Sequence, residues 1–252
     1  MKALLKKTLL GKALISVRNK LNGNLTLIEQ SKVSQMLLDG WKSADIPTKQ
    51  GLITKEELSK MYSGIIMQPF KVLADCIKLI NIENSTIIEI GCSTGYYYEV
   101  LSHLLDTKIR YTGVDYSVPM INEAKKKYRD VTFKVADATE LPFEDQEFDI
   151  VISGSCLLHI ADYSKAISES MRISRQWVIF HRTPVVKLPT QYFQKKAYGV
   201  PCVEIHFNEE SFIEICNRYG LVLHKTIDCD IFPNEEFSHK TYIFKKLLSR
   251  IN

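Results

Sequence analysis

The stretch Glu89-Ile-Gly-Cys-Ser-Thr-Gly95 decides the fold of this 252-residue chain. It ends an apolar, β-branched run at 86–90 and is followed by Tyr96-Tyr-Tyr-Glu-Val-Leu101, a segment suited to a helix. A glycine-rich turn between a strand and a helix lets a ligand approach the backbone closely, and the helix N-terminus offers free N–H groups. The stretch therefore predicts a ligand-binding turn at the tip of a buried strand.

Two common nucleotide-binding patterns do not fit this turn. In the dinucleotide pattern G-x-G-x-x-G, the second and third glycines would fall on Ser93 and Tyr96. A phosphate-binding loop needs Gly-Lys-Ser or Gly-Lys-Thr next, and neither follows. The sequence thus disfavours NAD, FAD and a P-loop nucleotide.

Short β-rich runs alternate with helical patterns from this turn onward. The runs lie at 86–90, 109–114, 131–136, 148–153 and 177–180, and helical stretches begin near Gly95, Val118 and Tyr163. This alternation is typical of βαβ units and predicts a parallel sheet with helices on both faces. Ligands bind such sheets at the carboxyl ends of the strands.

The chain before residue 85 shows helical patterns instead. Apolar residues recur three and four positions apart in 25–38, 55–62 and 69–80, and Thr54 with Glu57 predicts a capping box. We expect a basic helix over 1–22, a helical cap or lid over 23–84 and one α/β domain over 85–252.

Acidic residues follow three successive predicted strands. Glu89 ends the first strand, Asp115 ends the second within Gly113-Val-Asp-Tyr-Ser117, and Asp137 follows the third. A carboxylate at the second position is suited to both ribose hydroxyls, and one at the third to the amine of adenine. Each acid taken singly also fits a helix cap or a solvated loop. Their joint spacing predicts a nucleoside site.

These motifs make residues 85–250 resemble the class I S-adenosylmethionine-dependent methyltransferases. The resemblance extends through Asp137-Ala-Thr-Glu-Leu-Pro-Phe143, Phe148-Asp-Ile-Val-Ile-Ser153 and Leu157-Leu-His-Ile160. One departure is that the middle position of the first motif, often glycine, is Ser93. The hydroxyl of a serine there would be able to bond the carboxylate of the cofactor.

The resemblance implies a Rossmann-like α/β fold with a seven-stranded, mostly parallel sheet behind an N-terminal helical cap. Its last strand is antiparallel, and the runs at 221–227 and 241–244 are suited to this closing hairpin. The cap is expected to close over S-adenosyl-L-methionine, with Tyr62 or Gln68 as candidate contacts. Asp149 matches the family pattern with a structural role at the entrance to the fourth strand.

The resemblance also assigns the cofactor site residue by residue. The glycine turn would hold the amino-acid end, the second acid the ribose and the third position the adenine. Met120 matches a position that often covers the adenine face, although a core methionine fits equally well. The predicted cofactor-binding residues are Glu89, Gly91, Cys92, Ser93, Gly95, Asp115, Tyr116, Met120, Asp137, Ala138 and Ser153.

Three histidines are candidates for a catalytic base. His159 matches a position where many family members place a histidine beside the methyl group, and its ordinary pKa suits proton removal near neutrality. Its alternative role is to cap the next helix or only to shape the pocket. His181, directly after the fifth strand, and His206 compete for the catalytic role.

Residues 181–207 predict an acceptor-binding flap, because the segment is long for a connection and rich in aromatic residues. Arg182 would neutralise a phosphate or carboxylate of the acceptor, and Tyr198 would stack on a ring. Glu204 is the third predicted acceptor contact. The alternative is that these side chains only pack the flap onto the body.

Charge and cysteine content narrow the classes of protein. Six of the 33 basic residues lie in the first 20 positions, so the remainder carries 27 basic against 29 acidic groups. Because the chain after residue 20 is nearly neutral, it lacks the excess of basic residues that a broad nucleic-acid-binding surface would need.

The six cysteines include no C-x-x-C pair, which predicts reduced thiols, a cytoplasmic location and no metal site.

The leading hypothesis is methyl transfer to a hydroxyl or amine of a small molecule or sugar, such as an intermediate of surface polysaccharide biosynthesis. The alternatives are an RNA or protein acceptor, or a cofactor-binding homologue without transfer. The Asn/Asp-Pro-Pro-Tyr/Phe motif of nucleic-acid amino methylation is absent from Ser153-Gly-Ser-Cys156, and no DNA partner is expected. The sequence does not indicate an oligomeric state.

Residues 1–21 suit either peripheral contact with the inner face of a membrane or a basic helix that packs on the body or frays. Leu10, Leu14, Val17 and Leu21 recur at helical spacing among basic residues, which suits anionic lipid, while lysines interrupt any spanning run. We expect the full chain to float with anionic liposomes and a truncation beginning at Leu21 to stay at the bottom of the gradient. Equal flotation of both would contradict the prediction.

Overall fold

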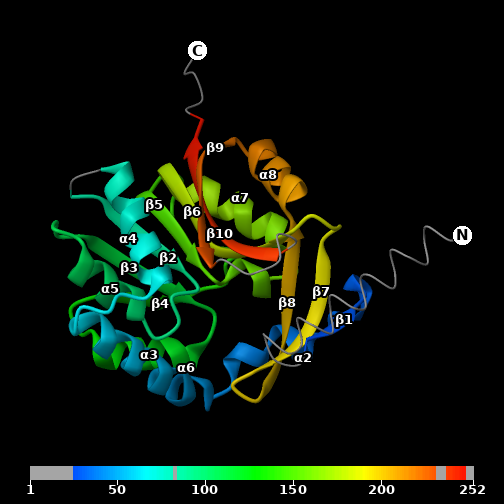
Figure 1. The fold of residues 1–252 in the computed structure, drawn as a ribbon, viewed down its shortest axis with the longest axis horizontal. Coiled ribbons are helices and arrows are strands. Elements are labelled where there is room, and N and C mark those ends of the chain that lie inside the picture. The colour runs from blue at the N-terminus through cyan, green and yellow to red at the C-terminus, as the bar shows by residue number, and fades with distance from the viewer. Residues whose placement is uncertain (1–24, 82–83, 231–236, 248–252) are drawn as a thin grey trace, which may run out of the picture.

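A twisted, mainly parallel sheet forms the centre of the molecule in a computed structural model that describes residues 25–81, 84–230 and 237–247 (Figure 1). The basic segment predicted at 1–22 lies outside these residues. The central strands are β2 (Thr86–Ile90), β3 (Arg110–Asp115), β4 (Thr132–Val135), β5 (Phe148–Gly154), β6 (Ser174–Val186), β9 (Leu221–Asp230) and β10 (Phe237–Lys246).

The pairing of these strands confirms the predicted Rossmann-like class. β2 lies between β3 and β5, β3 pairs with β4, and β5 pairs with β6, all in parallel. β10 then runs antiparallel between β6 and β9. The order β4-β3-β2-β5-β6-β10-β9 therefore closes with the antiparallel strand that the family resemblance implies.

Helices cover both faces of the sheet, as the alternating sequence pattern predicts. Helices α4 (Gln68–Ile80), α5 (Tyr96–Leu104) and α6 (Val118–Lys127) share a core with Ile87 and Ile150. Helices α7 (Tyr163–Ile173) and α8 (Glu209–Arg218) share a second core with Ile88 and Val151. Neighbouring strand residues enter opposite cores because side chains alternate across a sheet. No described helix is long and apolar enough to cross a membrane.

The segment at 181–207 is not a flap made of loop. β6 continues to Val186, and a hairpin follows, formed by β7 (Gln191–Ala197) and β8 (Val200–Asn208), drawn in yellow in Figure 1. β8 pairs in parallel with the end of β6, and β1 (Thr26–Ile28) pairs antiparallel with β7. The described sheet therefore has ten strands, and the predicted count of seven is wrong by β1, β7 and β8. The alternating residues Val203, Ile205 and Phe207 enter the core, and this period of two is what specifies a strand.

The N-terminal segment also differs from the helical expectation. Residues 25–38 form β1, the short turn η1 (Gln30–Lys32) and the single-turn helix α2 (Gln35–Leu38).

After η2 (Gly40–Lys42), helix α3 (Ile46–Tyr62) begins well before the predicted start at 55. Thr54 is therefore inside a helix, where its hydroxyl donates to the Gln50 carbonyl, and it does not form a capping box. Pro47 occupies the first turn, where its missing N–H costs nothing.

Asp149 has the predicted structural role at the entrance to β5. One carboxylate oxygen accepts hydrogen bonds from the Thr86 N–H at 2.8 Å and the Thr86 hydroxyl at 2.7 Å. The other oxygen pairs with Arg175. These contacts lock the starts of β2, β5 and β6 together and hold the pKa of Asp149 below its usual range.

We predict that Asp149→Ala lowers the free energy of unfolding by about 1–3 kcal/mol, because it leaves a partly buried Thr86 amide and hydroxyl without an acceptor. Urea denaturation measures the effect. Asp106→Ala, on the exposed loop after α5, is the matched control and should change stability by no more than about 0.5 kcal/mol. Equal stability of the two variants would refute the role of Asp149.

Candidate active site

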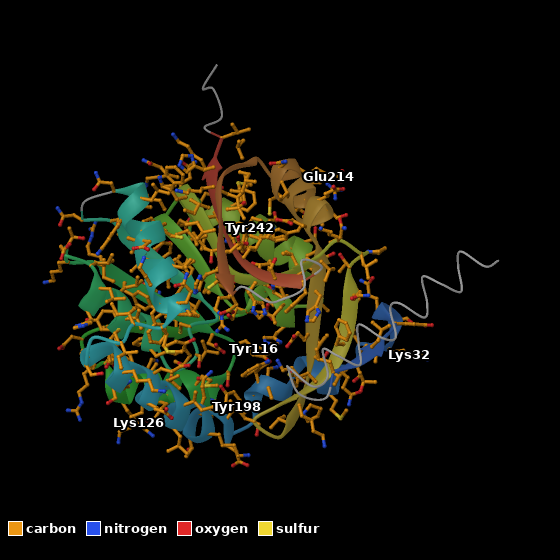
Figure 2. All side chains as sticks on the ribbon, in the orientation of Figure 1. Lys32, Tyr116, Lys126, Tyr198, Glu214 and Tyr242 are labelled. Carbon is orange, nitrogen blue, oxygen red and sulfur yellow. The ribbon has the colours of Figure 1, made fainter. Side chains whose placement is uncertain are left out.

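A cavity of about 510 Å³ lies at the carboxyl ends of β2 to β6, where the N-terminal segment covers the sheet edge. Its volume is within the range of roughly 300–1,000 Å³ that is usual for small-molecule sites. Figure 2 shows Tyr116 and Tyr198 in this part of the molecule, near the N-terminal helices. The N-terminal segment contributes Gln35, Leu38, Asp39, Trp41, Lys42 and Gln50 to the lining.

The glycine turn ties the tips of β2 and β3 together. The N–H groups of Gly91 and Cys92 both donate to the Val114 carbonyl, at 2.7 and 2.9 Å. Gly91 has a φ of 74°, and a Cβ there would overlap the Cys156 side chain. Gly95, with a φ of 78°, begins α5 against the Phe133 ring. Both positions therefore require glycine, and the backbone of Gly91 forms part of the cavity wall.

Ser93 keeps the tight turn although it replaces a frequent glycine. Its φ of 53° is left-handed, and its N–H donates to Asp115 Oδ2 at 3.0 Å. Its hydroxyl donates to Gln50 Oε1 of helix α3. The serine thus joins the turn to the N-terminal segment, at the edge of the cavity.

Asp115 ends β3 with its carboxylate fixed by two backbone amides. Oδ1 accepts from Ser117 N at 2.8 Å, and Oδ2 accepts from Ser93 N. Each oxygen keeps further lone pairs for a ligand hydroxyl. Burial raises the pKa of Asp115 to about 6, while the two amides oppose that rise. The arrangement suits a pair of ribose hydroxyls.

Other predicted cofactor residues surround Asp115 in the lining. Met120 and Ala138 give the cavity apolar walls, and Asp137 is held by the Thr139 N–H and hydroxyl at 2.8 and 2.7 Å. Tyr116 donates its hydroxyl to the Leu38 carbonyl at 2.6 Å. A fixed carboxylate beside apolar walls matches an adenosine, so the residues present fit S-adenosylmethionine.

Four predicted cofactor contacts do not line the cavity. Glu89 is 1% exposed and accepts a hydrogen bond from the Tyr111 hydroxyl, and burial raises its pKa to about 8. Cys92 and Ser153 are buried in the sheet core, and Gly95 acts only through the start of α5. These four residues therefore support the strand tips and the turn without forming part of the cavity wall.

His159 lies in the cavity wall at the end of η3 (Leu157–His159). Its Nδ1 is 2.6 Å from the Val203 carbonyl, which only accepts, so Nδ1 carries the hydrogen and Nε2 keeps the lone pair of the neutral ring. The Trp41 ring lies 4.8 Å from the His159 ring. Burial lowers the pKa of His159 to about 4, so the ring is neutral around pH 7.

The two competing histidines and Glu204 lie outside the cavity lining. His181 is buried, with Nδ1 2.9 Å from the Thr241 hydroxyl and its ring against Tyr97. His206 is buried with Nε2 2.7 Å from Glu204, whose other oxygen binds Lys195 at 2.6 Å. Their positions do not support the catalytic and acceptor roles expected for them, because each is enclosed within the β-structure.

Arg182 and Tyr198 do line the cavity, as predicted. Tyr198, at the β7–β8 turn, places its ring 6.0 Å from Trp41, and Lys49 donates to its carbonyl at 3.0 Å. Left-handed backbone at a residue other than glycine costs free energy and clusters at functional sites. The residues other than glycine with positive φ in this wall are Ser93, Ser155, Arg182 and Tyr198.

The sequence did not reveal Trp41 and Gln50, which the fold brings against His159 and Ser93. The expected contacts Tyr62 and Gln68 are not in the lining, and Tyr62 instead donates to Glu99 at 2.9 Å. Helical spacing gave the only available signal in this region, and it does not show which helix face meets the sheet edge.

Comparison with known proteins agrees with this geometry. Residues 88–180 match the methyltransferase domain family. Demethylmenaquinone methyltransferase of Roseiflexus sp. (strain RS-1) is 33% identical over 90 residues, which are 35% of this chain and 37% of that protein. The enzyme of the same name from Staphylococcus aureus (strain MRSA252) is 35% identical over 89 residues, or 34% and 37% of the two chains. The matches thus span little more than a third of these relatives.

Solved structures share the fold at low sequence identity. An S-adenosylmethionine-dependent methyltransferase of Clostridium acetobutylicum has a TM-score of 0.56 and 16% identity, over 74% of this chain and 95% of that one. A chain from the complex of the Haloferax volcanii Trm112 activator with a methyltransferase has a TM-score of 0.58 and 15% identity, over 82% and 100%. The [4+2]-cyclase SpnF has a TM-score of 0.55 and 16% identity, over 70% and 80%. Residues 88–180 therefore match a methyltransferase domain, and the solved structures show that the chain has the fold of S-adenosylmethionine-dependent methyltransferases.

Proposed function

We propose that this protein is an S-adenosylmethionine-dependent methyltransferase that methylates a hydroxyl group of a small-molecule or sugar acceptor. The observation that carries the proposal is the position of His159. Its ring is oriented by the Val203 carbonyl and lies in the wall of the same cavity as the Asp115 carboxylate. A carboxylate suited to ribose hydroxyls and a neutral imidazole thus share one cavity.

The side chains of the cavity would align the acceptor with the cofactor, and one of them would accept the proton of the acceptor hydroxyl. The cofactor supplies an activated methyl group, whose in-line transfer removes positive charge from sulfur. His159 Nε2 would accept the proton of the acceptor hydroxyl, while Nδ1–H keeps its bond to the Val203 carbonyl. Because burial keeps the ring neutral, the lone pair is available throughout the neutral pH range.

The acceptor side of the cavity favours a small, ring-containing molecule. The Trp41 ring lies between His159 and Tyr198, 4.8 Å from the first ring and 6.0 Å from the second, and the N-terminal segment lines the cavity beside the strand tips. Aromatic faces bind sugar and other ring systems, and a covered site excludes water. An amine acceptor is the alternative within this class, since it would need the same alignment and less help from a base.

Other acceptors have less support. The relatives named for demethylmenaquinone match about 90 residues, whereas Trp41, Arg182 and Tyr198 lie outside the matched domain at 88–180. We therefore do not transfer that acceptor to this chain. No described feature favours RNA or protein. A cofactor-binding homologue without methyl transfer stays an alternative, because the fold does not fix the reaction and one neighbour is named for a different one, a [4+2] cyclisation.

The finer assignments from sequence stay predictions. They are an acceptor from surface polysaccharide biosynthesis, a cytoplasmic location and lipid contact through residues 1–21, which lie outside the described residues.

We predict that Asp115→Asn weakens binding of S-adenosylhomocysteine at least about tenfold, because the amide replaces one acceptor oxygen by a donor. Titration calorimetry measures the affinity, with exposed Asp106→Asn as the control. In the wild type, affinity should also fall as pH decreases through about 6, where the Asp115 carboxylate becomes protonated. Absence of any binding by the wild type would overturn the proposed function.

We predict that His159→Ala lowers kcat by roughly 10²–10⁴-fold and leaves the affinity for S-adenosylhomocysteine nearly unchanged. Mass spectrometry of hydroxylated acceptors, incubated with isotopically labelled cofactor, first identifies an acceptor and then measures the rate. With the cofactor at saturating concentration, the wild-type kcat should fall as pH drops through about 4. His103→Ala, on the exposed side of α5, is the control. Full turnover by His159→Ala would disprove the base assignment.

A further inference from the structure

Arg182 reaches the cavity because β6 contains a bulge. Phe180 pairs with Tyr242 and Thr183 pairs with Lys240, so His181 and Arg182 together face the single residue Thr241. Arg182 has a φ of 53° at this point. Bulges of this kind redirect side chains beside binding sites. Here His181 packs into the core and the next side chain, Arg182, turns into the cavity wall.

The guanidinium of Arg182 is incompletely satisfied. Its contact with Asp230 is a single one, from Nη2 to Oδ2 at 3.4 Å, and that oxygen also lies 2.8 Å from His239 Nδ1. The Arg182 Nε is buried and has no hydrogen-bond partner within the described part of the chain. Arginine carries five N–H donors in a planar fork, so one long contact with Asp230 leaves donors of Arg182 without an acceptor among the described residues.

A second donor in the same wall also lacks an acceptor. The Trp41 indole Nε1 is buried and unpartnered among the described residues, and Trp41 lines the cavity. Lys42, the other lining residue with a fixed positive charge, is already paired with Asp39 at 2.6 Å. A buried N–H donor without an acceptor costs free energy. A ligand with several oxygen acceptors would remove this cost by accepting hydrogen bonds from both side chains.

We propose that Arg182 is an anion-binding residue of this cavity and takes the carboxylate or phosphate of a bound ligand. The inference rests on the proposed function for the identity of the other ligand in the site. Two ligands have the required chemistry: the cofactor itself, through the carboxylate of its amino-acid end, and an acidic acceptor. Arg182 would bind either through a bidentate contact, which a lysine does not reproduce.

The first arm of the test compares two cofactor analogues by titration calorimetry. S-adenosylhomocysteine carries the amino-acid carboxylate, and methylthioadenosine keeps the adenosine and thioether without it. If Arg182 binds the cofactor carboxylate, Arg182→Gln lowers the affinity for S-adenosylhomocysteine at least about tenfold and leaves that for methylthioadenosine unchanged. Arg129→Gln, at an exposed position after α6, should change neither affinity.

The second arm uses inorganic phosphate, titrated into the free protein and into the protein saturated with S-adenosylhomocysteine. If Arg182 binds an acidic acceptor, the saturated wild type binds phosphate and Arg182→Gln binds it at least about tenfold more weakly, with unchanged affinity for S-adenosylhomocysteine. Arg182→Lys should retain part of the affinity in whichever arm responds, because it keeps the charge and loses the fork.

Thermal melting of each variant establishes that it is folded, and Arg182→Lys replaces Arg182→Gln if the latter is not. The inference is overturned if folded variants match the wild type in both arms. Failure of the proposed function is a separate result, because it appears as wild-type protein that binds neither adenosine analogue. Phosphate binding to the free protein then still decides whether Arg182 holds an anion.

Discussion

The rest of the site depends on how the tips of β2 and β3 are joined. Two amides of the glycine turn donate to the Val114 carbonyl, and a third, from Ser93, donates to the Asp115 carboxylate. Only glycine fits at Gly91, because Cys156 occupies the space of a Cβ. The constraint orients the carboxylate before any ligand arrives, so binding needs little reorganisation of the protein. The Ser93 hydroxyl of the same turn donates to Gln50 Oε1, so the turn also fixes where helix α3 contacts the sheet edge.

The second wall of the cavity is built from chain segments distant in sequence and uses main-chain carbonyls as anchors. Tyr116 and Ser117, directly after β3, donate to the carbonyls of Leu38 and Trp41. His159 donates to the carbonyl of Val203 on β8. Backbone anchors of this kind hold side chains in one orientation, because the strands and turns that carry them are already fixed by packing.

Burial changes the pKa values of the ionisable groups in and directly behind the cavity, and the neighbours of each group decide its charge. It raises the pKa of Glu89 and lowers that of His159, so both favour their neutral forms near pH 7. Asp115 keeps two amide donors, which oppose the effect of its burial. Arg182 remains charged in the wall. The cavity thus presents a fixed carboxylate at the tip of β3 and a cation at the bulge of β6, a pattern suited to a ligand with hydroxyls at one end and an anionic group elsewhere.

The sequence alone determined the seven central strands, the glycine turn, Asp115 and the placement of His159 after the fourth strand, because strand periodicity and turn residues are local properties. It did not reveal β1, β7 and β8. The tertiary structure alone decided that Arg182, and not His181, enters the cavity, because a bulge depends on pairing with Thr241, far along the chain. It likewise decided that Trp41 and Gln50 form the cover. The sequence of a short helix does not show which of its faces will be buried. The residues that Trp41 and Gln50 contact are therefore fixed only when the helices pack against the assembled sheet.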